Sequence, residues 1–368
     1  MGEVKMIVHS YEELDAYLGG KVLLVCDSSI QFLKINSYFN QKQNIVRFSD
    51  FVPNPLYESV VNGVELFHRE KCDTIVAVGG GSAMDVAKCI KLYSNMNSEE
   101  NYLKQEIVPN DVPLIAVPTT AGTGSEATRY AVIYYQGEKQ SVADYSCIPS
   151  IVLFDTSVLE TLPLYQKKAT LMDAMCHSIE SFWSVNSTAE SKEYSRKALE
   201  IIINNYRDYL AGDHSKNELM LKASHIAGKA INITQTTAGH AMSYKLTSLF
   251  KIAHGHAAAL CIKGLWPFMV KHTDKCIDAR GEKYLIETFD EIAQAMGCSS
   301  VEEAINTFKN MVSELELCAP EAVSQEDFEV LKNSVNPVRL KNNPVALSTE
   351  DIDLIYHEIL GENANESR

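Results

Sequence analysis

The sequence predicts an α/β domain with a parallel sheet, followed by an all-helical domain. Up to about residue 160, short apolar runs alternate with stretches of helical periodicity, a pattern typical of βαβ units. After that point helical spacing continues and strand signals become scarce. A length of 368 residues, with 46% hydrophobic and 22% charged residues, suits two globular domains of ordinary size. We therefore expect domains at residues 1–160 and 161–368, with the boundary near Pro163.

Each expected element has its own sequence signal. Short β-rich apolar runs predict four strands, at KVLLVCD (21–27), DTIVAVGGGS (73–82), VPLIAVPTT (112–120) and IVLFD (151–155). Helical periodicity predicts helices at 58–72 and 83–95, which separate the first three strands. The run TRYAVIYYQGEKQSV (128–142) predicts a hairpin around Gly137 before the last strand. In the second domain, the same periodicity predicts helices at 163–185, 191–211, 217–234, 282–297, 301–316 and 349–360.

Composition excludes several classes of protein. The net charge of −15 argues against a nucleic-acid partner, because a polyanion would be repelled by the average field. The nine cysteines are odd in number and form no CxxC motif, which indicates reduced thiols in a cytosolic protein. No apolar stretch has the length of a membrane span or the pattern of a signal peptide. We therefore expect a soluble, cytoplasmic protein without a membrane partner.

A glycine-rich turn follows the second predicted strand, in VAVGGGSAMDVAK (76–88). Gly80 and Gly81 let the backbone approach a ligand closely, and the start of the following helix favours an anion such as a pyrophosphate. The alternative is a tight turn in which Ser82 is the N-cap residue and pairs with Asp85 as in a capping box. The pattern is neither GxGxxG nor a Walker P-loop, so it leaves both interpretations open.

A second polar loop, VPTTAGTGSEAT (117–128), follows the next strand. Its hydroxyl residues Thr119, Thr120 and Ser125 come at the carboxyl end of a parallel strand, where open α/β sheets bind ligands. The alternative is a long polar connection. Two such loops at consecutive strand ends favour a cofactor cleft. Asp27, at the end of the first strand, could accept from adenosine ribose hydroxyls and repel the phosphate of NADP, or could simply cap a turn.

Four potential metal ligands are spread over the second domain. Asp173 and His177 are separated by four residues in a helical stretch, so both lie on one helix face. His240 and His254 are further candidates, and Gly255 is expected to end one segment before another begins. One carboxylate and three imidazoles fit a catalytic divalent site that keeps a position open. The alternatives are a helix-face hydrogen bond and buried core histidines, because spacing alone does not show convergence.

Together these motifs closely resemble the iron-containing (group III) alcohol dehydrogenase family, in order and in spacing. The resemblance extends from about residue 21 to NNPVALSTEDI (342–352). The segments that carry it are PNP (53–55), GGGSAMDVAK (79–88), PTTAGTGSEAT (118–128), DAMCH (173–177), GHAMS (239–243) and AHGHA (253–257).

The resemblance implies a fold, a reaction and a set of site residues. The fold is a Rossmann-like N-terminal domain and a helical C-terminal domain, the architecture shared with dehydroquinate synthases. The reaction is NAD(P)-linked interconversion of an alcohol and an aldehyde, in a homo-oligomer that we expect to be a dimer. The implied catalytic metal ligands, for one Fe(II) or Zn(II), are Asp173, His177, His240 and His254. The residues implied to line the cofactor site are Asn54, Gly80, Gly81, Ser82, Asp85, Thr119, Thr120, Ser125 and Lys139. Asp27 matches the residue that faces the ribose in NAD-preferring members, so NAD(H) is expected over NADP(H).

One position departs from the family pattern. Some members carry a further histidine four residues after the third ligand, near the substrate, and here that residue is Tyr244. A tyrosine can still donate a hydrogen bond, but the proton relay of those members does not transfer directly. His256 is another candidate for the relay, or else a core or surface residue.

The substrate is expected to be a small aldehyde or alcohol, and an anionic one is favoured. Arg129 follows the second polar loop and Lys245 lies near His240, so both could contact an anion, although solvated surface charges are the alternative. With ATRYAVIY and SFWSVNSTAESKEYS, these residues look most like the family branch that reduces phosphonoacetaldehyde to 2-hydroxyethylphosphonate. The alternatives are a broad short-chain aldehyde reductase of the butanol or lactaldehyde/propanediol type, a dehydroquinate synthase-like lyase, and a non-catalytic NAD-binding regulator.

Overall fold

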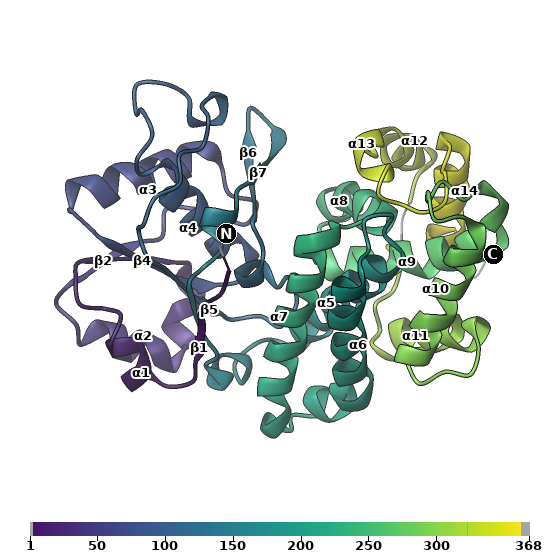
Figure 1. The fold of residues 1–368 in the computed structure, drawn as a ribbon, viewed down its shortest axis with the longest axis horizontal. Helices are drawn as coiled ribbons and strands as arrows, with labels where there is room; N and C mark the ends of the chain where they lie inside the picture. Colours follow the sequence, from purple (N-terminus) through teal and green to yellow (C-terminus); the bar gives the residue numbers. More distant parts are fainter. Residues whose placement is uncertain (1–2, 322, 362–368) are drawn as a thin grey trace. The chain divides into compact units, whose positions relative to one another are not determined.

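The centre of the first compact unit is a six-stranded parallel sheet. The computed structural model describes residues 3–321 and 323–361, whose fold is drawn in Figure 1. The sheet order is β1-β8-β5-β4-β2-β3. The bounds are β1 Met6–Val8, β2 Val22–Cys26, β3 Ile45–Phe48, β4 Thr74–Gly79, β5 Leu114–Pro118 and β8 Ile151–Leu153. The central strands β2, β4 and β5 are buried along their whole length, as expected for a parallel sheet covered on both faces. The predicted fold class is confirmed.

The structure contains the four predicted strands and two more. The additional strands, β1 and β3, pair at the two edges of the sheet and are partly exposed. The apolar runs of these edge strands are only three residues long in β1 and two in β3, so the sequence pattern missed them. The predicted hairpin consists of β6 (Tyr130–Tyr135) and β7 (Glu138–Ala143), and its two turn residues both have positive φ. The helices of this part are α1 Tyr11–Asp15, α2 Lys34–Asn40, α3 Tyr57–Arg69 and α4 Gly81–Tyr93.

The division into units differs from a simple cut near residue 160. The first unit consists of the described residues up to Pro163 together with Gly212–Gly228, and the second consists of Leu164–Ala211 and the described residues from Lys229 onward. Helix α7 (Asn217–Thr234) therefore belongs to the first unit through Gly228 and to the second from Lys229. In the first unit, buried His225 of this helix contacts buried Glu126, with 3.2 Å between Nδ1 and Oε1. This contact is one physical reason for the chain's return to the first unit.

The second unit is helical. Helices α5 and α9 pack together, and α8 packs on α9, around a core that includes the edge-to-face rings of Trp183 and Trp266. The bounds are α5 Leu164–Trp183, α6 Ala189–Leu210, α8 Ala238–Phe250, α9 His254–Lys271, α10 Glu282–Ala295, α11 Val301–Glu314, α12 Gln325–Ser334, α13 Pro337–Leu340 and α14 Thr349–Leu360. Among the described residues, no helix is both long enough and apolar enough to cross a lipid bilayer.

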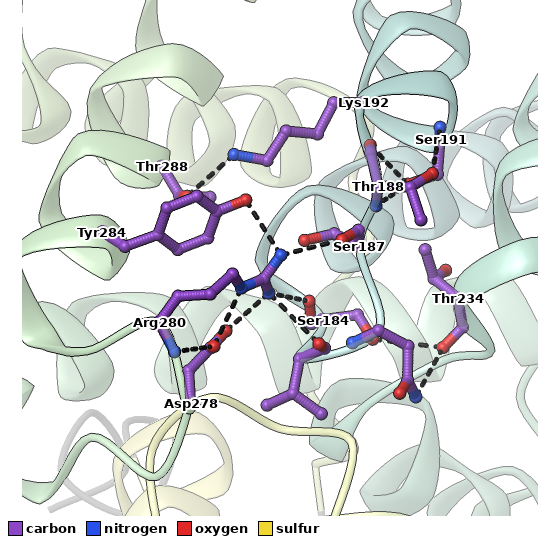
Figure 2. Close-up of polar contacts among 12 residues, drawn as sticks. Ser184, Ser187, Thr188, Ser191, Lys192, Thr234, Asp278, Arg280, Tyr284 and Thr288 are labelled. Atoms are coloured by element: carbon purple, nitrogen blue, oxygen red, sulfur yellow. Dashed lines mark hydrogen bonds and ion pairs between the residues drawn. The ribbon is translucent and has the colours of Figure 1, made fainter.

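Arg280 fixes the chain where α5 ends, as Figure 2 shows. Its Nη1 donates to the carbonyl oxygen of Ser187 over 2.7 Å, and its Nη2 donates to that of Ser184 over 3.0 Å. The same guanidinium pairs with the buried carboxylate of Asp278, at 2.6 Å from Nη2 to Oδ2. Carbonyl groups at a helix C-terminus lack partners within the helix, so a basic side chain there stabilises the helix end.

Replacing Arg280 should therefore destabilise the second unit without touching the predicted ligands. We expect Arg280→Met to lower the free energy of unfolding by about 2–3 kcal/mol, because several hydrogen bonds to a charged donor are lost. Urea unfolding followed by circular dichroism measures the change. The control is Lys283→Met, on α10, whose side chain is 91% exposed. Equal stability of both variants and the wild type would contradict the capping role.

Candidate active site

Three helices of the second unit bring the four predicted metal ligands together. Asp173 and His177 lie on α5, His240 on α8, and His254 is the first residue of α9. One ligand atom each from Asp173, His240 and His254 can be chosen so that all lie within 4.8 Å of one another. The Oδ1 atom of Asp173 is 3.4 Å from His240 Nε2 and 4.0 Å from His177 Nε2. The rings of His177 and His240 stack with their centroids 4.4 Å apart, so His177 borders the same cluster.

A glycine allows α9 to approach α5 closely at this cluster. A Cβ atom on Gly255 would lie 2.0 Å from the carbonyl oxygen of Ala169 and 2.7 Å from the Cβ of Asp173. The expectation that Gly255 ends a segment is wrong, because the residue lies inside the first turn of α9. Its role is close packing: only a residue without a side chain lets His254 reach the cluster beside Asp173.

The electrostatics of the cluster keep its carboxylate ionised. Burial alone would raise the pKa of Asp173, but the neighbouring His177, His240 and His254 together hold it below its usual value. An ionised carboxylate and three imidazoles are a donor set that Fe(II) and Zn(II) both accept, with coordination left over for a substrate. The residues present therefore fit a catalytic divalent metal.

Two aromatic side chains beside His254 have different roles. The ring of Tyr244 stacks parallel to that of His254, at 5.5 Å between centroids. His256 faces away from the ligand group: its Nε2 lies 2.9 Å from the carbonyl oxygen of Cys318, and its Nδ1 lies 3.1 Å from the hydroxyl of Tyr165. That hydroxyl also accepts from the backbone N–H of Ala253 over 3.0 Å. His256 thus holds the turn before His254, and burial lowers its pKa.

The glycine turn of the first unit lies at the start of α4. Gly80 is the N-cap residue and no side chain caps this helix, so the proposed capping by Ser82 is wrong. Asp85 instead accepts from the Ser125 hydroxyl over 3.2 Å and from the Val132 N–H over 3.1 Å. Burial raises the pKa of Asp85 to about 6, although the charges of Lys88 and Lys139 oppose the rise. Without a capping side chain, the first-turn N–H groups of α4 remain suited to a phosphate.

The second polar loop lies directly beside this turn. Gly79 pairs with Pro118 in the sheet, and the N–H of Thr119 donates to the carbonyl oxygen of Gly79 over 3.0 Å. A Cβ atom on Gly80 would lie 3.4 Å from the Thr120 hydroxyl oxygen, and one on Gly81 would lie 3.3 Å from Thr123 Cγ2. The two loops therefore form one surface, as their positions at neighbouring strand ends predicted.

The other residues predicted to line the cofactor site are Asp27, Asn54 and Lys139. Asp27 accepts from the Ser29 N–H over 2.7 Å, and its other oxygen lies 3.8 Å from where a Cβ of Gly79 would stand. It is therefore both a turn cap and a neighbour of the glycine turn. Asn54 is exposed and has a positive φ of 60°. Lys139 lies half-buried on β7.

The two basic substrate candidates lie in different units. The guanidinium of Arg129 lies over the rings of Tyr130 and Tyr145, at 4.8 and 4.7 Å, and donates to the Tyr145 hydroxyl over 2.7 Å. Lys245 is half-buried on α8, directly after Tyr244.

Sequence reasoning missed several titratable groups that the structure buries beside the second loop and the ligand cluster. Lys88 on α4 is completely buried, and its amine donates to oxygens of Ser125 and Thr128 in the second loop and of Tyr130 just after it. Glu180 on α5 is completely buried against α8. The Glu126–His225 pair fixes the second loop to α7. The only available signal was that Glu180, like His177, falls on the Asp173 face of α5 by helical spacing.

Comparison with known proteins places these observations in a family. Residues 4–156 match the family described as iron-containing alcohol dehydrogenase, and residues 167–360 match the C-terminal part of the Fe-containing alcohol dehydrogenase family. Lactaldehyde reductase of Escherichia coli strain K12 is 30% identical over 328 residues, covering 84% of this chain and 83% of that enzyme. Aldehyde-alcohol dehydrogenase 2 of Entamoeba histolytica is 29% identical over 325 residues, which cover 80% of this chain but only 37% of that longer protein.

A solved structure supports the fold. The sulfoacetaldehyde reductase from Bifidobacterium kashiwanohense, crystallised in complex with NAD+, has a TM-score of 0.85 with 23% identity, over 98% of both chains. The two family matches, the sequence identity and the shared fold lead to one conclusion. The chain belongs to the iron-containing alcohol dehydrogenase family.

Proposed function

We propose that this protein is a metal-dependent, NAD(H)-linked aldehyde reductase that acts reversibly on the corresponding alcohol. The observation that carries the proposal is the convergence of Asp173, His240 and His254, with His177 stacked beside them. Asp173, His177, His240 and His254 would hold the ion. When bound, the ion would polarise the carbonyl oxygen and the reduced nicotinamide would supply the hydride.

The chain's own residues would prepare the reactants in two ways. In the first unit, the uncapped start of α4 and the adjoining hydroxyls of Thr119 and Thr120 would bind the cofactor phosphates and fix their orientation. Asp27, beside the glycine turn, would accept from the ribose hydroxyls and repel a 2′-phosphate, which favours NAD(H) over NADP(H). In the second unit, the hydroxyl of Tyr244 would donate a proton to the alkoxide product, in place of the histidine of other family members.

We further propose phosphonoacetaldehyde as the substrate, with 2-hydroxyethylphosphonate as the product. Lys245 supports this proposal because it follows Tyr244 on α8 and is only half exposed. The ammonium group of Lys245 would bind the phosphonate by charge-assisted hydrogen bonds. The sulfoacetaldehyde reductase with the same fold acts, by its name, on another two-carbon aldehyde that carries a strong anion.

The substrate proposal predicts a clear preference. The wild-type protein should oxidise NADH with phosphonoacetaldehyde at a kcat/KM at least about tenfold above that with butanal, since one charge-assisted contact contributes about 1.5–3 kcal/mol. Absorbance at the NADH band measures both rates. A preference for butanal would refute the anionic pocket and favour a broad short-chain reductase. Turnover without net NADH consumption would favour the lyase.

Substitution of Lys245 tests the contact itself. Lys245→Gln should raise KM for phosphonoacetaldehyde and leave the kinetics with butanal unchanged, because only the first substrate carries the anion. The matched control is Lys271→Gln, at the exposed last position of α9, which should change neither. Equal effects on both substrates would assign Lys245 to packing instead.

A further inference from the structure

We propose that Glu180 is a positioning residue that fixes the tautomer of His240, and that it thereby sets the affinity of the site for its ion. The inference rests on the proposed metal-dependent function. Glu180 lies on α5 three residues after His177 and seven after Asp173, so helical spacing places all three on one face. Its side chain is completely buried, which is costly for a carboxylate unless specific partners compensate.

The two oxygens of Glu180 have separate partners. Oε1 accepts three hydrogen bonds, from the Thr237 N–H at 3.0 Å, the Thr237 hydroxyl at 2.6 Å and the His240 N–H at 3.2 Å. Oε2 is in hydrogen-bond contact with Nδ1 of His240. Because a carboxylate is an acceptor, this contact places the ring hydrogen on Nδ1.

In a neutral ring, the opposite nitrogen of His240 then carries the lone pair. Nε2 faces the ligand cluster, 3.4 Å from Oδ1 of Asp173. A neutral imidazole binds a metal through the nitrogen that carries no hydrogen, so the contact with Glu180 prepares Nε2 as the ligand atom. Figure 2 draws other polar contacts of this unit, where Arg280 contacts the carbonyl oxygen of Ser184, directly after the end of α5 that carries Glu180.

A purely structural role is the competing explanation. Glu180 also accepts from the first N–H groups of α8, so it would stabilise that helix even if no metal ever bound. Stability alone therefore cannot distinguish the two roles. Metal affinity can, because only the tautomer explanation links Glu180 to the ligand atom of His240.

Glu180→Gln tests the proposal with almost no change in size. Three donors surround Oε1, so the amide oxygen should occupy that position and the NH2 group should face Nδ1. Nδ1 must then accept, which moves the ring hydrogen to Nε2 and blocks the ligand atom. We expect zinc affinity of the metal-free protein to fall about 10–100-fold, measured by competition with a chromophoric chelator. The visible absorption bands of cobalt(II) bound to the variant should also change.

The control removes a buried hydrogen bond from the next residue of the same helix. Ser181→Ala loses the contact of its hydroxyl with that of Thr234, at 2.8 Å, and does not touch His240. It should lower the unfolding temperature and leave zinc affinity unchanged. Wild-type zinc affinity in Glu180→Gln would overturn the inference. Absence of zinc binding in the wild-type protein would instead overturn the proposed function.

A measurement on the wild-type protein keeps the inference testable if Glu180→Gln does not fold. Nitrogen NMR of the zinc-loaded protein, with histidine labelled and His240 assigned by substitution, identifies the nitrogen that binds the ion. We expect zinc at Nε2 and a hydrogen on Nδ1. Zinc at Nδ1 of His240 would exclude the role proposed for Glu180.

Discussion

Turnover and bound metal should both be lost from His254→Ala, while the chain remains folded. The residue offers one of three ligand atoms that lie within 4.8 Å of one another. Loss of a ligand removes several kcal/mol of transition-state stabilisation, so kcat/KM should fall by about a thousandfold or more. His254 is only half-buried and begins α9, so its removal leaves little empty space in the core. Metal analysis of the purified variant and NADH-linked assays measure the two losses.

The control uses the same residue type at the other end of the same helix. His272 follows the last residue of α9 and contacts Phe268, far along the helix from His254. His272→Ala should retain one equivalent of metal and wild-type turnover. The unfolding temperature of His254→Ala, compared with the metal-free wild-type protein, checks that the fold survives. Retained metal and activity in His254→Ala would refute the ligand assignment.

A large loss of stability is expected from Lys88→Met. The amine of Lys88 is 2.6 Å from the carbonyl oxygen of Ser125 and 2.7 Å from that of Tyr130, and it also donates to the hydroxyls of Ser125 and Thr128. Methionine removes the hydrogen bonds of this amine to all four oxygens and removes the charge that most opposes the raised pKa of Asp85. We expect the free energy of unfolding to fall by about 3–5 kcal/mol, measured by urea unfolding.

The loss should depend on pH in a definite direction. Burial raises the pKa of Asp85 from 3.8 to about 6, so protonated Asp85 contributes stability at low pH that disappears as the pH rises through 6. Without Lys88 the pKa of Asp85 rises further, so the variant loses more stability between pH 5 and pH 7.5 than the wild-type protein does. The difference in unfolding free energy should therefore be larger at pH 7.5 than at pH 5. When Lys88→Met is added to Asp85→Asn, the loss of unfolding free energy should be the same at both pH values. A loss that still grows with pH would mean that Asp85 is not its source.

The sequence predicted the central strands because burial on both faces selects continuous apolar runs. The runs around β2, β4 and β5 are of this kind, and each ends in a recognisable turn or loop. The edge strands β1 and β3 are partly exposed, and their apolar runs of three and two residues are too short to mark a strand. Strand pairing at an edge is a tertiary event that local pattern does not encode.

The candidate metal ligands could be singled out from the sequence where residue type and surrounding motif coincide. Asp173, His177, His240 and His254 stand out by type and by the motifs around them, whereas Glu180 and Lys88 look like the exposed charges of any amphipathic helix. Only burial distinguishes them: both side chains are completely inaccessible. The start of α4 shows the opposite error, because Ser82 and Asp85 match a cap by spacing while Gly80 takes the N-cap position.

The return of residues Gly212–Gly228 to the first unit has a consequence for synthesis on the ribosome. Domains usually fold in order as they emerge, starting from the N-terminus. Here the sheet and both loops can be complete in the nascent chain while His225, the partner of Glu126, has not yet been translated. The first half of the protein must therefore wait, with a buried carboxylate still unmatched, until much of α7 has left the exit tunnel.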